Sequence, residues 1–184
     1  MAKLLIKNVR LAFPALFQPQ AFGDGEPAYS AKFIIDPKSP EAGLVRDALT
    51  VAATEKWGAK AEAVLKSLKA DKKVCFVEAP YLNKNGDAYD GFEDKFYLSS
   101  RNSDLKPSTF SASGQPVSAE DGVIYSGCFV DASVEIYAQD NKWGRRINCS
   151  LRGVRFANPG NSFGGGTVAS ASEFGPVSDF EDFV

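Results

Sequence analysis

Two neighbouring stretches in the last third of the chain alternate apolar and polar residues with a period of two. This pattern constrains the fold more than any other feature of the sequence. The apolar residues of the first stretch, GCFVDASVEIY, share one face: Cys128, Val130, Ala132, Val134 and Ile136. Those of the second, RRINCSLRGVRF, are Ile147, Cys149 and Leu151. Because successive side chains of a β-strand point to opposite faces, both stretches predict strands with one buried face. The turn AQDNKWG between them predicts a long β-hairpin.

Further strands are predicted at residues 5–13, 29–36, 74–79 and 95–101. The alternation in the first of these places five residues on one face: Leu5, Lys7, Val9, Leu11 and Phe13. A helix is predicted from the capping residue Ser39 to Trp57, ended by Gly58, with a second helical segment at residues 59–70. About six strands with one helical insertion predict a mainly β fold. An OB-fold-like small barrel accommodates the insertion, the long loops and the closing hairpin, although periodicity alone does not distinguish it from a sandwich.

The composition changes after Phe156. Residues 157–184 contain five glycines and no Lys or Arg. A segment this poor in branched apolar side chains cannot offset the entropy cost of ordering. The sequence therefore predicts a folded domain at residues 1–156 and a flexible acidic tail at residues 157–184.

Several function classes are disfavoured by what the sequence lacks. There is no histidine, which removes the commonest general base and any Ser-His-Asp or Cys-His pair. The three cysteines are far apart and fall in strand-like stretches, where a buried, reduced thiol is typical. Lys7, Asn8 and Arg10 interrupt the apolar start, and no window is long enough for a membrane span. We expect a cytoplasmic protein that is not an enzyme and has no cofactor, metal site or membrane partner.

Charge is distributed unevenly along the chain. The net charge is −2, but four of the 23 acids and none of the 21 bases lie after residue 156, so the preceding domain carries a net charge of +2. Basic side chains gather on the predicted strands, interleaved with aromatic residues. Lys and Arg neutralise phosphates, and flat rings stack on unpaired bases. This combination predicts a nucleic-acid-binding face made of Lys3, Lys7, Arg10, Lys95, Tyr97, Arg101, Tyr137, Trp143, Arg145, Arg146 and Arg152. Solvated basic residues and core aromatics remain the alternative interpretation.

The C-terminal end mixes acids with phenylalanines. Its last residues include Asp179, Phe180, Glu181, Asp182 and Phe183. An anionic tail can compete with nucleic acid for a basic face, in a manner screened by salt. The two phenylalanines suggest that the tail also docks in an apolar pocket of a partner protein.

Four stretches of the sequence carry a resemblance to a known family: LLIKNVRLAFPALFQP, YDGFEDKFYLSSRNSD, the block from GVIYSGC to RGVRF, and SDFEDFV. With these, the chain resembles the single-stranded DNA-binding proteins of tailed phages, which have an OB fold and an acidic, Phe-containing tail. The resemblance implies sequence-nonspecific coating and protection of single-stranded DNA during phage replication and recombination in the infected bacterial cell.

The resemblance also implies where contacts lie. DNA would contact the strand with Lys95 and Tyr97 and the final hairpin with Tyr137, Trp143 and Arg145. The tail, from Asp179 through Phe183, would shield the DNA groove and recruit replication proteins such as a DNA polymerase. Self-association on DNA is compatible with this function. One departure is that the chain ends in Val184, whereas some related tails end in an aromatic residue.

Two other functions are weighed against DNA binding. A structural or assembly protein of a virus particle would also combine a strand-rich body with a flexible tail. A carboxylate-metal enzyme would use the acidic run Asp87, Asp90, Glu93 and Asp94, but this run fits no calcium-loop spacing and its glycines indicate turns.

Overall fold

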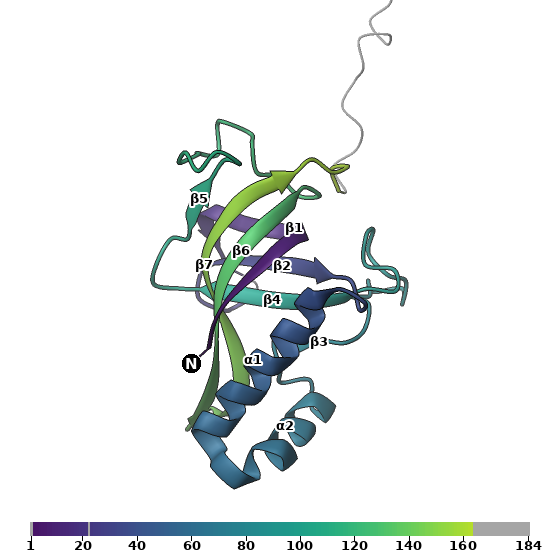
Figure 1. Ribbon diagram of the computed structural model, residues 1–184, viewed down its shortest axis with the longest axis vertical. Helices are drawn as coiled ribbons and strands as arrows, with labels where there is room; N and C mark the ends of the chain where they lie inside the picture. Colours follow the sequence, from purple (N-terminus) through teal and green to yellow (C-terminus); the bar gives the residue numbers. More distant parts are fainter. Residues whose placement is uncertain (1, 22, 164–184) are drawn as a thin grey trace, which may run out of the picture.

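The computed structural model describes residues 2–21 and 23–163, which form a closed five-stranded barrel with a helical insertion (Figure 1). The barrel strands are β1 (Ala2–Gln20), β2 (Ala28–Ile35), β4 (Phe96–Asn102), β6 (Phe129–Asn141) and β7 (Gly144–Asn158). Two short strands, β3 (Phe76–Val77) and β5 (Ser108–Phe110), extend the sheet beside β4 and β7. The helical insertion between β2 and β3 consists of α1 (Pro40–Trp57), the 3-10 turn η1 (Gly58–Lys60) and α2 (Ala61–Ala70).

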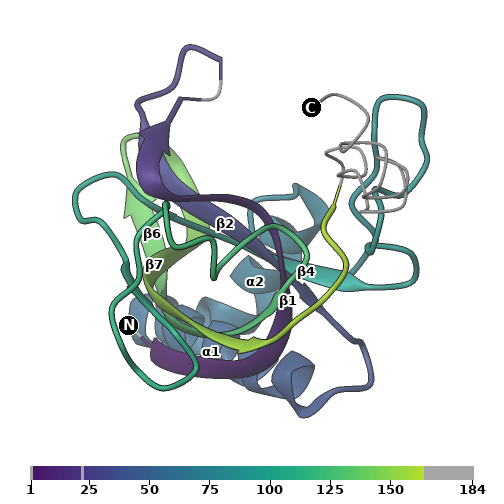
Figure 2. The ribbon, with the colours of Figure 1, turned by 90° about the horizontal axis from the view of Figure 1, so that it is seen from above.

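The strand order β1-β2-β4-β7-β6 returns to β1, which gives the ring of strands seen end-on in Figure 2. β1 pairs antiparallel with both β2 and β6, whereas β4 and β7 run parallel, with Arg101 opposite Ser150. A five-stranded barrel of this kind is an OB-fold-like barrel. The predicted fold class is therefore confirmed, including the helical insertion and the closing hairpin.

The interior of the barrel is filled by the apolar faces of the strands. In β6 and β7 the alternation predicted from the sequence is confirmed, because the inward residues are almost fully buried: Cys128, Val130, Ala132, Val134, Ile136, Ile147, Cys149 and Leu151. Opposite them, Ala31, Phe33 and Ile35 of β2 and Leu98 of β4 complete the core. The two hairpin strands stay paired from Phe129 and Asn158 to the tight turn at Asn141 and Gly144.

The regular alternation predicted for β1 is wrong, because the strand changes face twice. Asn8 and Phe13 have φ angles of 52° and 49°, in the left-handed region that breaks an extended strand, and the pairing register shifts at both places. As a result Ile6, not Leu5, enters the core. Phe13 also leaves the core, and its side chain is 45% exposed on the outer surface.

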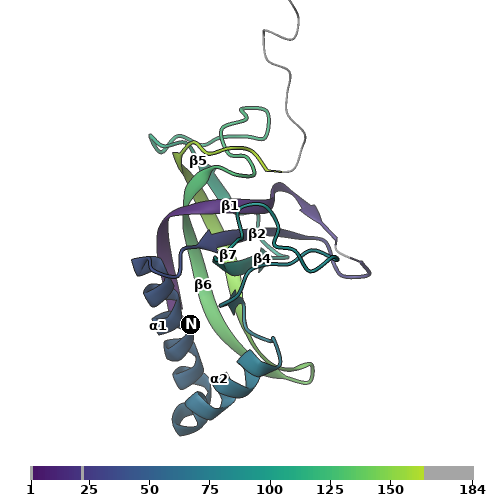
Figure 3. The same ribbon diagram turned by 90° about the vertical axis from the view of Figure 1, so that its right-hand side faces the viewer.

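The helices cover one end of the barrel. α1 begins after Ser39 and ends at Trp57, as predicted, with Gly58 at a φ of 55°. The predicted side-chain cap is wrong, because the Ser39 hydroxyl donates to the Asp36 carbonyl instead of accepting from a helix amide. Its buried residues, including Val45 and Leu49, pack against β1 and β6 (Figure 3). The predicted strand at 74–79 is shorter than expected, since only Phe76–Val77 pairs continuously and Val74 forms one bridge to Ile147. No helix in the described part of the chain is long and apolar enough to cross a membrane.

The C-terminal strand extends past the predicted end of the folded domain. β7 continues to Asn158, and the chain as far as Phe163 lies against the barrel, with the Phe163 amide donating to the Ser126 carbonyl over 3.0 Å. The remaining tail lies outside the described residues, and with it the predicted partner residues Asp179, Phe180, Glu181, Asp182 and Phe183.

Leu98→Ala should lower the free energy of unfolding by about 2–5 kcal/mol, because a fully buried leucine loses its packing and leaves a cavity. Leu105→Ala is the matched control, since Leu105 is 70% exposed and its truncation should cost less than about 0.5 kcal/mol. Urea denaturation followed by circular dichroism measures both. Equal losses for the two variants would contradict the assigned barrel interior.

Candidate nucleic-acid interface

The outer face of β2 and β4 is the candidate functional site. In OB barrels the face of the second and third barrel strands, flanked by the loops between the first two and the last two strands, binds oligonucleotides. Those strands are β2 and β4 here. Their outward residues form cross-strand pairs, with Ile34 opposite Tyr97 and Lys32 opposite Ser99. The β1–β2 loop and the tip of the β6–β7 hairpin project to one side of the barrel (Figure 3).

Five aromatic rings gather on this face, and we call them the aromatic platform: Phe13, Tyr81, Tyr89, Phe92 and Tyr97. The ring centroids of Tyr81 lie 4.9 Å from Tyr89 and 5.2 Å from Tyr97, and those of Phe13 and Tyr89 are 5.2 Å apart. Phe92 is buried beneath them against Ala12 and Ile34. The platform thus holds partly exposed rings in fixed positions, which is what stacking of unpaired bases requires.

A tight turn in the loop between β3 and β4 places two of these rings side by side. Asn83 and Asp87 close the turn, with the Asp87 carbonyl accepting a hydrogen bond from the Asn83 amide over 2.7 Å. Gly86 supplies the φ of 85° that the turn requires. The Tyr89 amide then donates to the Tyr81 carbonyl over 2.9 Å, so the two tyrosines face each other across the turn.

Lys32 is the cation of the platform. Its Nζ donates to Ser99 Oγ over 2.9 Å and lies 4.8 Å and 5.4 Å from the ring centroids of Tyr81 and Tyr97. Burial lowers the pKa of Lys32, since the ammonium loses hydration. Within the described residues no carboxylate pairs with it. Its charge is therefore available to a phosphate group.

Three of the residues predicted from the sequence lie at this face. Tyr97 belongs to the aromatic platform, where burial, and then the neighbouring Tyr81, raise its pKa. Arg101 is exposed on β4 and donates to the Glu26 carbonyl of the β1–β2 loop over 2.9 Å. Lys95 precedes β4 and forms an ion pair with Asp36 at 3.4 Å.

Four more of the predicted residues lie on the β6–β7 hairpin: Tyr137, Trp143, Arg145 and Arg146. Trp143 sits at the tip, 77% exposed, with Lys142 Nζ 5.1 Å from its ring centroid. Arg145 is tied to Asp140 at 3.2 Å, and Trp57 Nε1 donates to the same carboxylate. This arrangement fixes the tip beside α1 and leaves the Trp143 ring open to a ligand.

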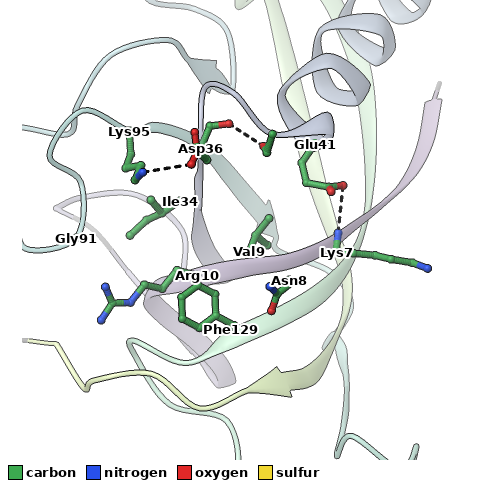
Figure 4. A pocket seen from close by; sticks show the side chains of 11 residues that line it. Lys7, Asn8, Val9, Arg10, Ile34, Asp36, Glu41, Gly91, Lys95 and Phe129 are labelled. Atoms are coloured by element: carbon green, nitrogen blue, oxygen red, sulfur yellow. Dashed lines mark hydrogen bonds and ion pairs between the residues drawn. The ribbon is translucent and has the colours of Figure 1, made fainter.

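The other four predicted residues lie on β1 and β7 and are not part of the platform: Lys3, Lys7, Arg10 and Arg152. On the outer face of β1, β6 and β7, Lys3 lies opposite Glu135, and Arg152 forms an ion pair with the same carboxylate at 3.0 Å. Lys7 and Arg10 line an open pocket of about 370 Å³ beside the platform, together with Lys95 (Figure 4). The contribution of all eleven residues to DNA binding stays a prediction.

Sequence reasoning missed Lys32 and four of the five platform rings, namely Phe13, Tyr81, Tyr89 and Phe92. One signal for two of them was present. Tyr81 and Tyr89 stand at equal distances on either side of Asn85, which forms with Gly86 an Asn-Gly pair typical of a tight turn. Because a turn of this kind brings its flanks together, the pairing of the two rings could have been inferred.

The acidic run proposed for a metal enzyme does not form a site. Glu93 Oε2 accepts a hydrogen bond from the Gly91 amide, so this carboxylate caps a turn. Among residues 2–21 and 23–163 no three His, Cys, Asp or Glu side chains come close enough to hold a metal ion. Cys128 and Cys149 are buried free thiols, and burial raises the pKa of each.

Comparisons with known proteins agree with this picture. The family model described as Enterobacter phage Enc34, ssDNA-binding protein, matches residues 2–184. The protein p50 of Acyrthosiphon pisum secondary endosymbiont phage 1 is 39% identical over 186 residues, covering 98% of this chain and 96% of the relative.

Two solved structures share the fold. The single-stranded DNA-binding protein from bacteriophage Enc34, in complex with ssDNA, has a TM-score of 0.72 at 21% identity, covering 88% of this chain and 89% of that one. The single-stranded DNA-binding protein gp2.5 of bacteriophage T7 has a TM-score of 0.56 at 15% identity, covering 100% and 96%.

Replacing Lys32 with methionine should produce a stability difference that depends on pH. The folded-state pKa of Lys32 is lowered, so the charged lysine is penalised below that pKa and the penalty disappears as pH rises to the ordinary value of 10.5. Relative to Lys32→Met, the wild type should therefore gain stability between neutral pH and 10.5. Tyr97 titrates in both proteins and largely cancels in the difference.

Urea denaturation of both proteins at several pH values measures this difference. A gap between wild type and Lys32→Met that stays constant over the range would show that the ammonium is well hydrated in the folded protein. Lys38→Met is the control, because Lys38 is exposed on the short segment between β2 and α1.

Proposed function

The chain belongs to the family of the Enterobacter phage Enc34 ssDNA-binding protein, and from this premise we propose that it binds single-stranded DNA without sequence preference. The observation that carries the proposal is the aromatic platform with Lys32 on the outer face of β2 and β4. Rings stack on any base because every base has a π-face, while the lysine neutralises phosphate. Neither contact reads base edges, so the binding tolerates any sequence.

The hairpin tip extends the proposed interface. Trp143 offers an exposed ring next to Lys142, and Arg101 adds a charge on β4. The loops that flank the β2–β4 face are the ones that hold oligonucleotides in OB folds. A strand of DNA would therefore run from the platform across Arg101 toward the hairpin.

Binding of this kind needs no catalytic group, and we propose a non-enzymatic role. The protein would coat and protect single strands during phage replication and recombination in the cytoplasm of the infected cell. The virion-assembly alternative receives no support from the comparisons, because the matching family and both solved structures are described as ssDNA-binding proteins.

We assign the acidic tail two roles in this proposal. Its four acids would compete with DNA for the basic face, and Phe180 and Phe183 would dock on a replication protein such as a DNA polymerase. The support is its composition, four acids without a base, and its starting point. The described chain ends at Phe163, which packs against the cluster of Ala12, Ile34 and Phe92 beneath the platform.

Tyr89→Ala should weaken binding of an unstructured oligonucleotide by about 1–3 kcal/mol, roughly five- to 150-fold in Kd, because one stacking ring is lost. Fluorescence anisotropy of a labelled oligothymidine measures the affinity at several salt concentrations. The slope of log Kd against log salt should stay unchanged, whereas Arg101→Gln should reduce it by about one phosphate contact.

Phe110→Ala is the control for the tyrosine variant, since this partly buried ring lies on β5, beside the C-terminal half of β7. It should leave the affinity unchanged. If Tyr89→Ala binds as tightly as the wild type, the platform is not the DNA site. If the wild type itself shows no salt-sensitive binding, the proposed function fails.

Removing residues 164–184 should strengthen DNA binding at low ionic strength. The deleted segment holds four acids and no base, so the net charge rises from −2 to +2 while the docked residues up to Phe163 are kept. The gain should shrink as salt rises, because screening already weakens the competition of the tail.

A full-length control separates charge from length. It replaces the four tail acids by their amides: Glu173→Gln, Asp179→Asn, Glu181→Gln and Asp182→Asn. It should bind as tightly as the truncated protein. Equal affinity of wild type, truncated and amide forms would show that the tail does not shield the DNA site.

A further inference from the structure

The Arg10 side chain lies at the edge of the aromatic platform with its guanidinium held on two sides. Its Nε donates to the Gly127 carbonyl over 3.0 Å, and its Nη2 donates to the Asn161 carbonyl over 2.8 Å. These bonds fix the orientation of the guanidinium plane. The Phe129 ring lies 5.8 Å from the Arg10 Cζ, and Figure 4 shows the guanidinium directed toward Gly91.

The ring of Phe163 occupies the open side of this guanidinium. Its centroid is 4.0 Å from the Arg10 Cζ, the distance of a stacked pair. Gly91 makes room for the ring, because a Cβ atom at that position would collide with it. Phe163 also packs against the cluster of Phe92, Ala12 and Ile34. It therefore extends the apolar cluster that lies beneath the platform.

The segment before Phe163 is held more firmly than Phe163 itself. Tyr125 and Gly160 exchange two hydrogen bonds, at 2.8 Å from the hydroxyl to the carbonyl and 3.1 Å from the amide to the hydroxyl. Glycine at positions 127 and 160 permits this close approach of the two backbones. At Phe163 itself the backbone amide donates to the Ser126 carbonyl. Rotation of the Phe163 side chain would break none of these hydrogen bonds.

We propose that the site between Arg10 and Gly91 is a nucleobase subsite and that Phe163 occupies it when no DNA is bound. This subsite rests on the proposed binding of single-stranded DNA and adds one base contact to it. Guanidinium planes and aromatic rings are the two surfaces on which unpaired bases stack in nucleic-acid-binding proteins. A base entering here would replace one flat ring by another on the same guanidinium. Lys95 lines the adjoining pocket, where the phosphate of that nucleotide would compete with Asp36 for its ammonium.

This exchange explains why a fixed guanidinium, an aromatic ring and three close glycine contacts coincide at one place. Arg10 forms no ion pair with a carboxylate in the described part of the chain, so its charge is not neutralised by the protein. The ring of Phe163 shields the guanidinium face without adding a negative charge. DNA can displace the ring and gains both the stacking surface and the charge.

The test compares four proteins: wild type, Phe163→Ala, Arg10→Lys and the double variant. Binding of oligothymidines of increasing length is measured by anisotropy, and thermal unfolding is recorded for each protein. Phe163→Ala should bind about two- to tenfold more tightly, because DNA no longer has to displace a ring. The shortest oligonucleotide that gives full affinity should stay the same in the wild type and in Phe163→Ala.

Arg10→Lys keeps the charge and loses the flat stacking surface. It should weaken binding, shorten the oligonucleotide that gives full affinity by about one nucleotide, and cancel the gain from Phe163→Ala. Phe110→Ala serves as the control for loss of a ring elsewhere.

A merely structural role of Phe163 predicts a different result. Phe163→Ala would then lower the unfolding temperature and leave the affinity unchanged or weaker, and this outcome overturns the inference. A gain in affinity that persists in the Arg10→Lys background also overturns it. In both cases the wild type still binds DNA through the platform, so the proposed function stands. Loss of binding in every protein, wild type included, removes both.

Discussion

The barrel and its outer site both depend on how β1 changes face. This strand has to pair with β2 on one side and β6 on the other, and a strictly alternating strand would point Phe13 into the core. Left-handed backbone at Asn8 and Phe13 is costly for residues other than glycine. At Asn8 the cost is offset locally, since the amide donates to Asp131 and the side chain accepts from Asn158. At Phe13 the compensation comes from edge-on contacts with Tyr81 and Tyr89.

Local signals in the sequence are sufficient for the elements that alternate without interruption. The two hairpin strands, the extent of α1 and the Asn85–Gly86 turn follow from side-chain period and from the Pro, Gly and Asn residues at their ends, and the structure has them in place. The platform could not be predicted in this way. Its rings come from β1, the β3–β4 loop and β4, and these segments meet because β1 and β4 flank β2 in the sheet. Period two also assigned Phe13 to the wrong face, because a backbone break leaves no mark in the apolar pattern.

Counting basic residues along the sequence overstates the positive charge of the last hairpin, because the count does not show which acids lie opposite them. Arg152 and Arg155 contribute to the basic count of the last hairpin, yet Glu135 and Asp131 on the neighbouring strand pair with them. Exposed pairs of this kind add little stability, and a phosphate would have to displace the carboxylate to reach these cations. For Lys32 the sequence gives too little weight to a charge. It stands alone among apolar residues in YSAKFII, and it becomes informative only when two tyrosine rings flank it.

A surface of partly exposed rings carries a hazard, because contiguous apolar patches promote association of protein molecules. Edge contacts between the rings bury part of each one, and Phe92 anchors them from below. Lys32 keeps a charge in the middle of the patch, which disfavours packing of a second apolar surface while favouring a polyanion. The burial that lowers its pKa is a cost in folding stability. The buried core of the barrel beneath the platform offsets this cost in folding stability.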